Sequence, residues 1–220
     1  MLRVTIDISS FPDPWPEVFE ALGYAKEPER LRLRKKLPLF GVLKRKVSAQ
    51  ALCNRIETLS PLAQMAALED IDLCGARRVD DLSPLAGCSK LKSVVMWQTG
   101  IRDLQALAGK AMLRRLYVWC TNITSLEPLA TTKLLEVLNI EFTPVESLAP
   151  LGGLKKLTEL NISGTPIRLL DALEKVPIAS LLAYRTALDP ESLKRFRAAH
   201  PGCVILEGDE YPNKSTRCGC

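Results

Sequence analysis

The sequence repeats itself every 22 residues over about three-fifths of its length. The clearest copy is LTELNISGTPIRLLDALEKV, residues 157–176, and its apolar outline returns three times at steps of 22 and once at a step of 23. The five copies begin at Leu68, Leu91, Leu113, Leu135 and Leu157. An incomplete copy precedes them and a degenerate one follows, through residues 178–188. A copy this short cannot bury its apolar face alone, so the copies must stack into a solenoid.

Residues 56–190 resemble the 22-residue leucine-rich repeats of the bacterial internalins and of the leucine-rich regulatory subunit of protein phosphatase 1. The stretch SGTPIRLL looks most like the bacterial versions. The resemblance implies an α/β fold: a right-handed, curved horseshoe with a parallel sheet on its concave face and short 3₁₀ or helical segments on its convex face. The family usually has Asn at the turn position where this chain has Thr99, Thr121, Thr143, Thr165 and Thr186. Because a Thr hydroxyl offers one donor and an Asn amide offers two, we expect fewer hydrogen bonds in these turns.

The sequence predicts four segments along the chain. Residues 1–46 form an N-terminal cap with a strand, a short helix and a basic stretch, and residues 47–190 form the repeats. Prolines in the recurring LSPLAG, LEPLAT and LAPLGG favour tight 3₁₀ segments on the convex side, since proline presets φ for a first helical turn. Residues 191–207 form a C-terminal helix and strand, with Asp189 as N-cap and Pro190 at the first helical position. Residues 208–220 form a tail without periodicity, expected to be flexible.

Composition points to an ordinary soluble chain in the cytoplasm. Hydrophobic residues make up 47% and charged residues 25% of the sequence, and no stretch has the length of a secretory signal or a membrane span. The seven cysteines follow no disulfide framework, which favours free thiols in a reducing compartment. A net charge of +5 is too mild to indicate nucleic acid as a partner.

The residues between the core positions of each strand should point to the concave side, because side chains alternate along a strand. Adjacent strands then bring Trp97 beside Trp119 and Val95 beside Tyr117, next to Arg115. Trp, Tyr and Arg dominate binding hot spots, so we expect a protein partner on this face. The predicted contact residues are Val95, Trp97, Arg115, Tyr117, Trp119, Asn139, Glu141 and Glu159. The simpler alternative is that the indoles only cover the sheet.

Acidic residues are expected on both sides of this aromatic patch. Asp70 and Asp72 precede it, and Glu141 and Glu159 follow it. This arrangement favours a partner whose apolar groups are ringed by positive charge.

Two other features suggest a competing function. Residues 30–46 carry eight Lys or Arg and no acid, which suits a solvated cap, an acidic partner or an anionic membrane surface. The chain ends in Cys218-Gly219-Cys220, similar to the doubly prenylated ends of Rab GTPases, so Cys218 and Cys220 are lipidation candidates. Together they describe a membrane-associated adaptor or bacterial effector.

The sequence lacks the common signatures of enzymes. It has no glycine-rich phosphate loop, no HExxH and no GxSxG, and we expect no catalytic residues, no cofactor and no metal site. His200 and Cys203 are close enough in sequence to suggest a nucleophile pair. We interpret His200 as structural, at the end of a helix, and Cys203 as a core residue of the closing strand.

Overall fold

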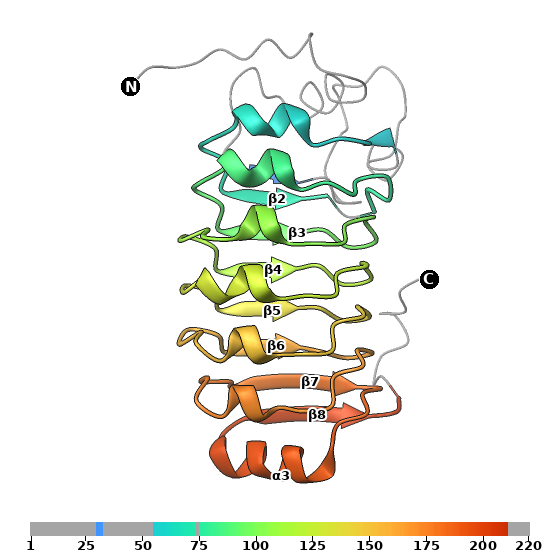
Figure 1. Cartoon of the computed structure of the whole chain (residues 1–220), viewed down its shortest axis with the longest axis vertical. Coiled ribbons are helices and arrows are strands. Elements are labelled where there is room, and N and C mark those ends of the chain that lie inside the picture. Colours follow the sequence, from blue (N-terminus) through green and yellow to red (C-terminus); the bar gives the residue numbers. More distant parts are fainter. Residues whose placement is uncertain (1–29, 33–54, 74, 211–220) are drawn as a thin grey trace.

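Each copy of the repeat folds as one rung of a solenoid, with a strand in one layer and a short 3₁₀ segment in the other (Figure 1). The computed structural model describes residues 30–32, 55–73 and 75–210. The elements of these residues follow in the order β1 (Arg30–Arg32), η2 (Ser60–Gln64), β2 (Asp70–Asp72), η3 (Ser83–Gly87), β3 (Ser93–Val95), η4 (Gln105–Leu107), β4 (Arg115–Tyr117), η5 (Glu127–Thr131), β5 (Val137–Asn139), η6 (Ala149–Leu151), β6 (Glu159–Asn161), η7 (Asp171–Leu173), β7 (Ser180–Tyr184), α3 (Pro190–Ala199) and β8 (Val204–Gly208). This alternation confirms the α/β leucine-rich repeat solenoid.

The described strands form one eight-stranded parallel sheet in chain order. Residues 22 positions apart lie side by side, so Leu116 pairs with Leu138 and Leu138 with Leu160. These middle residues of the strands point into the core and are at most 1% exposed. The leucines of the 3₁₀ segments, such as Leu129 and Leu151, close the core from the other side. Each rung therefore buries its apolar residues only together with its neighbours, as the period predicts.

Every rung turns away from the sheet through a residue with positive φ. These residues lie at equivalent positions, and their φ angles run from 52° to 78°: Gly75, Gln98, Cys120, Phe142, Gly164 and Arg185. Side chains other than glycine pay roughly 1–2 kcal/mol in this region. The 22-residue architecture therefore imposes this turn even where the sequence has no glycine.

The Thr that follows this turn makes one hydrogen bond in four of the five rungs. Its hydroxyl donates to the carbonyl three residues earlier at 2.5–2.8 Å in Thr121, Thr143, Thr165 and Thr186. Thr99 is buried, and its Oγ1 has no hydrogen-bond partner among the described residues. The expectation of sparsely bonded turns therefore agrees with the structure.

The helix α3 and the strand β8 close the C-terminal end, as the sequence predicts. The Asp189 carboxylate accepts a hydrogen bond from the Ser192 amide at 2.8 Å, and Pro190 opens the helix. Phe196 seals the end of the core and is 2% exposed. On the surface, Arg195 donates two hydrogen bonds to Asp171 of η7 and thereby lowers the pKa of that carboxyl.

Several sequence predictions lie outside the described residues. They concern the N-terminal strand and helix of residues 1–24, residues 33–46 of the basic stretch, and the tail from residue 211 with Cys218 and Cys220. The domain boundaries likewise stay predictions. Among the helices that the structure describes, none has the length and apolar character needed to cross a membrane.

Candidate functional site

Two tryptophans stack on each other over neighbouring rungs. Trp97 follows β3 and Trp119 follows β4, at equivalent positions 22 residues apart. Their ring centroids lie 5.7 Å apart and their planes differ by 3°, an offset parallel stack. Both side chains are half-buried. The structure thus places the two indoles together as the sequence predicts.

Tyr117 and Arg115 extend the aromatic pair along β4. The Tyr117 ring meets Trp119 edge to face, with centroids 6.3 Å apart and an interplanar angle of 80°. Arg115 is exposed, and within the described residues its guanidinium has no ion pair or hydrogen bond. Val95 pairs with Tyr117 in the sheet register, as predicted, but is only 6% exposed, and its role in partner contact stays a prediction. The neighbouring Tyr117 and Trp119 are more exposed to solvent than Val95.

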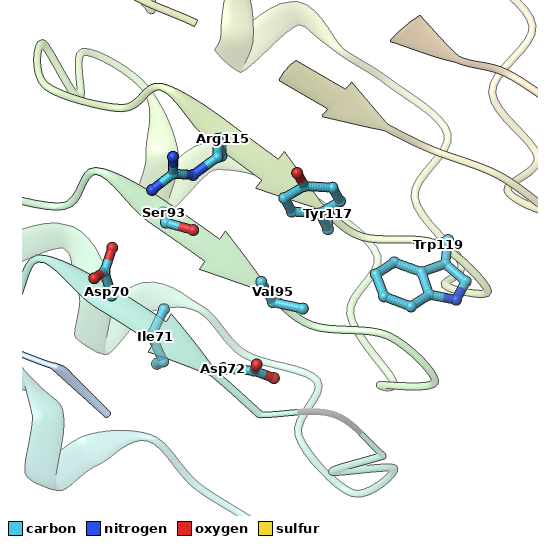
Figure 2. A pocket seen from close by; sticks show the side chains of 8 residues that line it. All are labelled: Asp70, Ile71, Asp72, Ser93, Val95, Arg115, Tyr117 and Trp119. Carbon is cyan, nitrogen blue, oxygen red and sulfur yellow. The ribbon is translucent and has the colours of Figure 1, made fainter. Parts of the chain in front are cut away.

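A hollow of about 370 Å³ lies over β2, β3 and β4, on the face of the sheet turned away from the core. Arg115, Tyr117 and Trp119 border it. This side of the sheet is the concave face. Figure 2 shows Arg115 reaching over Ser93, with Tyr117 and Trp119 along one side of the hollow and Asp70 and Asp72 along the other. Ser93 and Val95 form its floor together with Ile71 of the core.

The acidic residues around the hollow are less available than the sequence suggested. Asp70 and Asp72 are 6% and 3% exposed, and both interact within the fold. The sheet register places Arg30 beside Asp70 and Arg32 beside Asp72, so the basic stretch begins inside the sheet as the edge strand β1.

Glu141 is also withdrawn from the surface. It is 8% exposed, and its carboxylate accepts a hydrogen bond from the Asn161 amide at 3.1 Å. Of the four predicted acidic residues, only Glu159 is exposed. The prediction of a partner ringed by positive charge therefore loses its basis, and the exposed charge beside the tryptophans is the cation of Arg115.

Asn139, a predicted contact residue, has a structural task in its own rung. Its side-chain oxygen accepts the Glu141 amide hydrogen at 2.9 Å, and Asn161 does the same for Ser163 at 3.0 Å in the next rung. Both side chains hold the chain as it leaves the strand. A role of Asn139 in partner binding stays a prediction.

His200 and Cys203 are not arranged as a nucleophile and its base. The ring nitrogens of His200 lie 3.0 Å from the Phe196 carbonyl oxygen and 2.7 Å from the Val176 carbonyl oxygen, and its ring stacks on Phe196. Burial raises the pKa of the Cys203 thiol, which disfavours the nucleophilic thiolate. In the part of the chain that the structure describes, no cluster of three His, Cys, Asp or Glu side chains is suited to a metal ion.

The cysteines differ from the sequence expectation at one position. Cys88 and Cys203 are free thiols. Cys120 is disulfide-bonded, so the expectation of free thiols throughout the chain was wrong there. The odd count and irregular spacing of the cysteines gave no signal for this bond.

A buried lysine, Lys110, was not predicted from the sequence. Lys110 is 5% exposed, and its ammonium donates to the Ala86 carbonyl at 2.5 Å. Burial lowers the pKa of this ammonium. The equivalent residues of the other rungs are apolar or uncharged: Met65, Cys88, Thr132, Leu154 and Val176. Aligning the copies position by position reveals the exception, whereas reading the leucines alone does not.

Comparison with solved structures shows the same fold in bacterial leucine-rich repeat proteins. The internalin InlC2 of Listeria monocytogenes superposes with a TM-score of 0.61 at 24% identity, over 72% of this chain and 73% of that one. The internalin InlF of the same organism gives 0.60 at 20% identity, over 72% of this chain and 58% of InlF. A leucine-rich repeat protein of Leptospira interrogans gives 0.55 at 16% identity, over 66% of this chain and 44% of that one.

No protein-family model matches the sequence, and no curated protein matches it significantly. The likeness to solved structures shows the leucine-rich repeat fold, with repeats that resemble those of the internalins.

Proposed function

We propose that this chain is a non-enzymatic interaction module that holds a protein partner on its concave face, over β3 and β4. The observation that carries the proposal is the stacked pair Trp97 and Trp119, with Tyr117 edge-on, beside the exposed Arg115. Large aromatic side chains and arginine are the residues that most often dominate binding energy. In the generic β6 rung the equivalent positions are held by Glu159, Asn161 and Ser163, so the scaffold does not require aromatic residues there.

The geometry also describes the partner's chemistry. The stack and Tyr117 offer flat, half-buried apolar surface that suits an apolar or aromatic side chain. Arg115 offers a guanidinium that suits a carboxylate beside it. The partner we propose therefore presents an apolar side chain next to an acidic one, which replaces the basic ring expected from the sequence.

The test is a binding measurement with the full chain. A partner is captured from extract of the source cells, identified by mass spectrometry and purified, and its Kd is measured for wild type and variants. The triple variant Trp97→Ala, Tyr117→Ala, Trp119→Ala should bind at least about thirtyfold more weakly, the loss expected for removing one hot spot of about 2 kcal/mol. Arg115→Glu changes only an exposed side chain and should weaken binding about tenfold.

The matched control changes two exposed residues of the opposite layer, Gln105→Ala in η4 and Glu127→Ala in η5. It should bind like wild type. A triple variant with a native circular dichroism spectrum and an unchanged Kd would refute the concave-face site. If the triple variant does not fold, Arg115→Glu decides, and an unchanged Kd for it refutes the role of the cation.

We also propose that the module acts in the cytoplasm. Its free Cys88 and Cys203 fit that compartment, and we expect the Cys120 disulfide of the structure to be reduced there. Alkylation of living cells before lysis, followed by mass spectrometry, reports the thiol state of Cys120. A disulfide at Cys120 in most molecules would refute the cytoplasmic location.

A further inference from the structure

A side-chain oxygen caps the start of the 3₁₀ segment in five successive rungs. It lies two residues before the first residue of the 3₁₀ segment and accepts that residue's backbone N–H at 2.7–3.2 Å. Such a cap satisfies an amide that would otherwise lack a partner at the start of a helical turn. The five capping residues are Thr58, Asp81, Asp103, Ser125 and Ser147.

Leu169 occupies the next position of this column and breaks the rule. It precedes η7 as Ser147 precedes η6, but its side chain has no oxygen to accept a hydrogen bond. It is not a core residue either, because it is 57% exposed. The η7 rung therefore lacks this cap and exposes a large apolar side chain. The amide of the next residue, Leu170, donates to the Ser192 hydroxyl of α3 at 2.8 Å instead.

A hollow of about 580 Å³ lies next to Leu169, between the η6 and η7 rungs. Pro166 and Ala172 border it from the η7 rung, and Leu148 and Ala149 from the η6 rung. The hollow belongs to the 3₁₀ layer and the turn that leads into it, not to the strands. It is thus separate from the concave face of the proposed function.

Two charges on the rim of this hollow have no partner within the described residues. Glu146 and Arg168 hold equivalent positions in adjacent rungs, both are exposed, and neither side chain forms an ion pair or hydrogen bond there. Elsewhere acids and bases of adjacent rungs do pair, as Arg114 does with Glu136. The patch of Leu169, Glu146 and Arg168 therefore combines an exposed apolar centre with one unpaired charge of each sign.

We propose that this Leu169 patch is a contact between two copies of the chain. A two-fold axis running along the rungs, between η6 and η7, sets the η6 rung of one copy against the η7 rung of the other. It brings Glu146 of each copy opposite Arg168 of its partner and seats each Leu169 in the other copy's hollow. The patch is self-complementary in charge, as a two-fold contact requires. With one exposed apolar side chain from each copy and two ion pairs, we expect a weak dimer that forms at high protein concentration.

The test is sedimentation equilibrium of the full chain, 24.3 kDa as a monomer. From about 5 µM to about 500 µM, the range of weak contacts, the wild-type average mass should rise toward twice that value. Leu169→Ser gives the η7 rung the residue of its neighbour and should stay monomeric. Because the serine restores the cap, its thermal unfolding midpoint should not fall below that of wild type, which separates lost contact from lost folding.

Charge reversal makes the prediction specific. Glu146→Arg and Arg168→Glu should each weaken the dimer about tenfold, and the double variant should restore it because the charges face each other again. The control is Met112→Ser, which removes another exposed apolar side chain, 41% exposed, far from the patch in sequence, and should dimerise like wild type. A wild type that stays monomeric, a dimer untouched by Leu169→Ser, or a double variant no better than the single ones would overturn the proposal.

Discussion

The turns of the solenoid contain an internal comparison that tests how hydrogen bonding stabilises the rungs. Thr99 and Thr121 hold equivalent positions in neighbouring rungs and are 5% and 4% exposed. The Thr121 hydroxyl donates to the Val118 carbonyl at 2.7 Å, whereas the Thr99 hydroxyl has no partner in the described structure. Replacing each by Val keeps the shape of the side chain and removes only the hydroxyl.

We expect the two substitutions to change stability in opposite directions. Thr121→Val removes a hydrogen bond and leaves the Val118 carbonyl oxygen buried without it, so the free energy of unfolding should fall by roughly 1–2 kcal/mol. Thr99→Val removes a buried hydroxyl that gains nothing in the fold, so the free energy of unfolding should rise by about 1 kcal/mol. The variants should therefore differ by roughly 2–3 kcal/mol, or about 5–10 °C in Tm for a domain of this size.

The assay is urea denaturation followed by far-ultraviolet circular dichroism, with equal slopes required in all variants. Thr143→Val is the control, because the Thr143 hydroxyl donates to the Ile140 carbonyl at 2.6 Å and its loss should match that of Thr121. If Thr99→Val destabilises as much as Thr121→Val, the hydroxyl of Thr99 makes a stabilising bond and the reasoning fails.

Two further predictions concern backbone strain and a buried charge. In urea denaturation, Gly164→Ala should lower the free energy of unfolding by at least about 2 kcal/mol more than Gly109→Ala. Both residues have positive φ, but a Cβ on Gly164 would clash with the Phe142 ring, whereas a Cβ on Gly109 would meet open space. An equal loss would show that Phe142 moves aside freely. Burial lowers the pKa of Lys110, so the unfolded chain binds more protons than the folded one between that lowered pKa and about 10.4, and wild-type stability should gain with rising pH there. Lys110→Met should be more stable than wild type near pH 7, with an advantage that shrinks toward pH 10 in the same assay; an advantage independent of pH would contradict the assignment to Lys110.

The layered fold was predictable because a leucine at a fixed period has one role in every copy. The register of the strands follows from the period alone, and so does the approach of Trp97 to Trp119, which sit 22 residues apart. The C-terminal helix was predictable for a different reason, because Asp189 and Pro190 are local signals that act within a single turn. Both kinds of inference need no knowledge of distant side chains.

The exposure of the concave side chains was not predictable in the same way. Alternation along a strand tells which face a side chain takes, but not what covers it there. Asp70 and Asp72 are buried beside a strand formed by Arg30–Arg32, which lies some 40 positions away and outside the period. Glu141 is drawn in by Asn161 of the next rung. The prediction of an exposed acidic rim was therefore wrong for Asp70, Asp72 and Glu141, because contacts between rungs, and not the repeat itself, decide their exposure.

A repeat protein supplies its own reference state, because each rung shows what the scaffold needs at a given position. A position filled by Trp in two rungs and by Glu and Ser in the next two does not require an aromatic residue, and a capping position that accepts Leu169 does not require an oxygen. The two departures lie on different surfaces: the aromatic pair on the concave face over β3 and β4, and Leu169 in the 3₁₀ layer at η7.

A dimer through the Leu169 patch therefore leaves both concave faces open. Two open faces in one particle would bind a multivalent partner with an avidity well above that of one face. Leu169→Ser should then weaken capture of a partner immobilised at high density while leaving the Kd for the same partner in solution unchanged, and an equal effect in both formats would place Leu169 in the partner site itself.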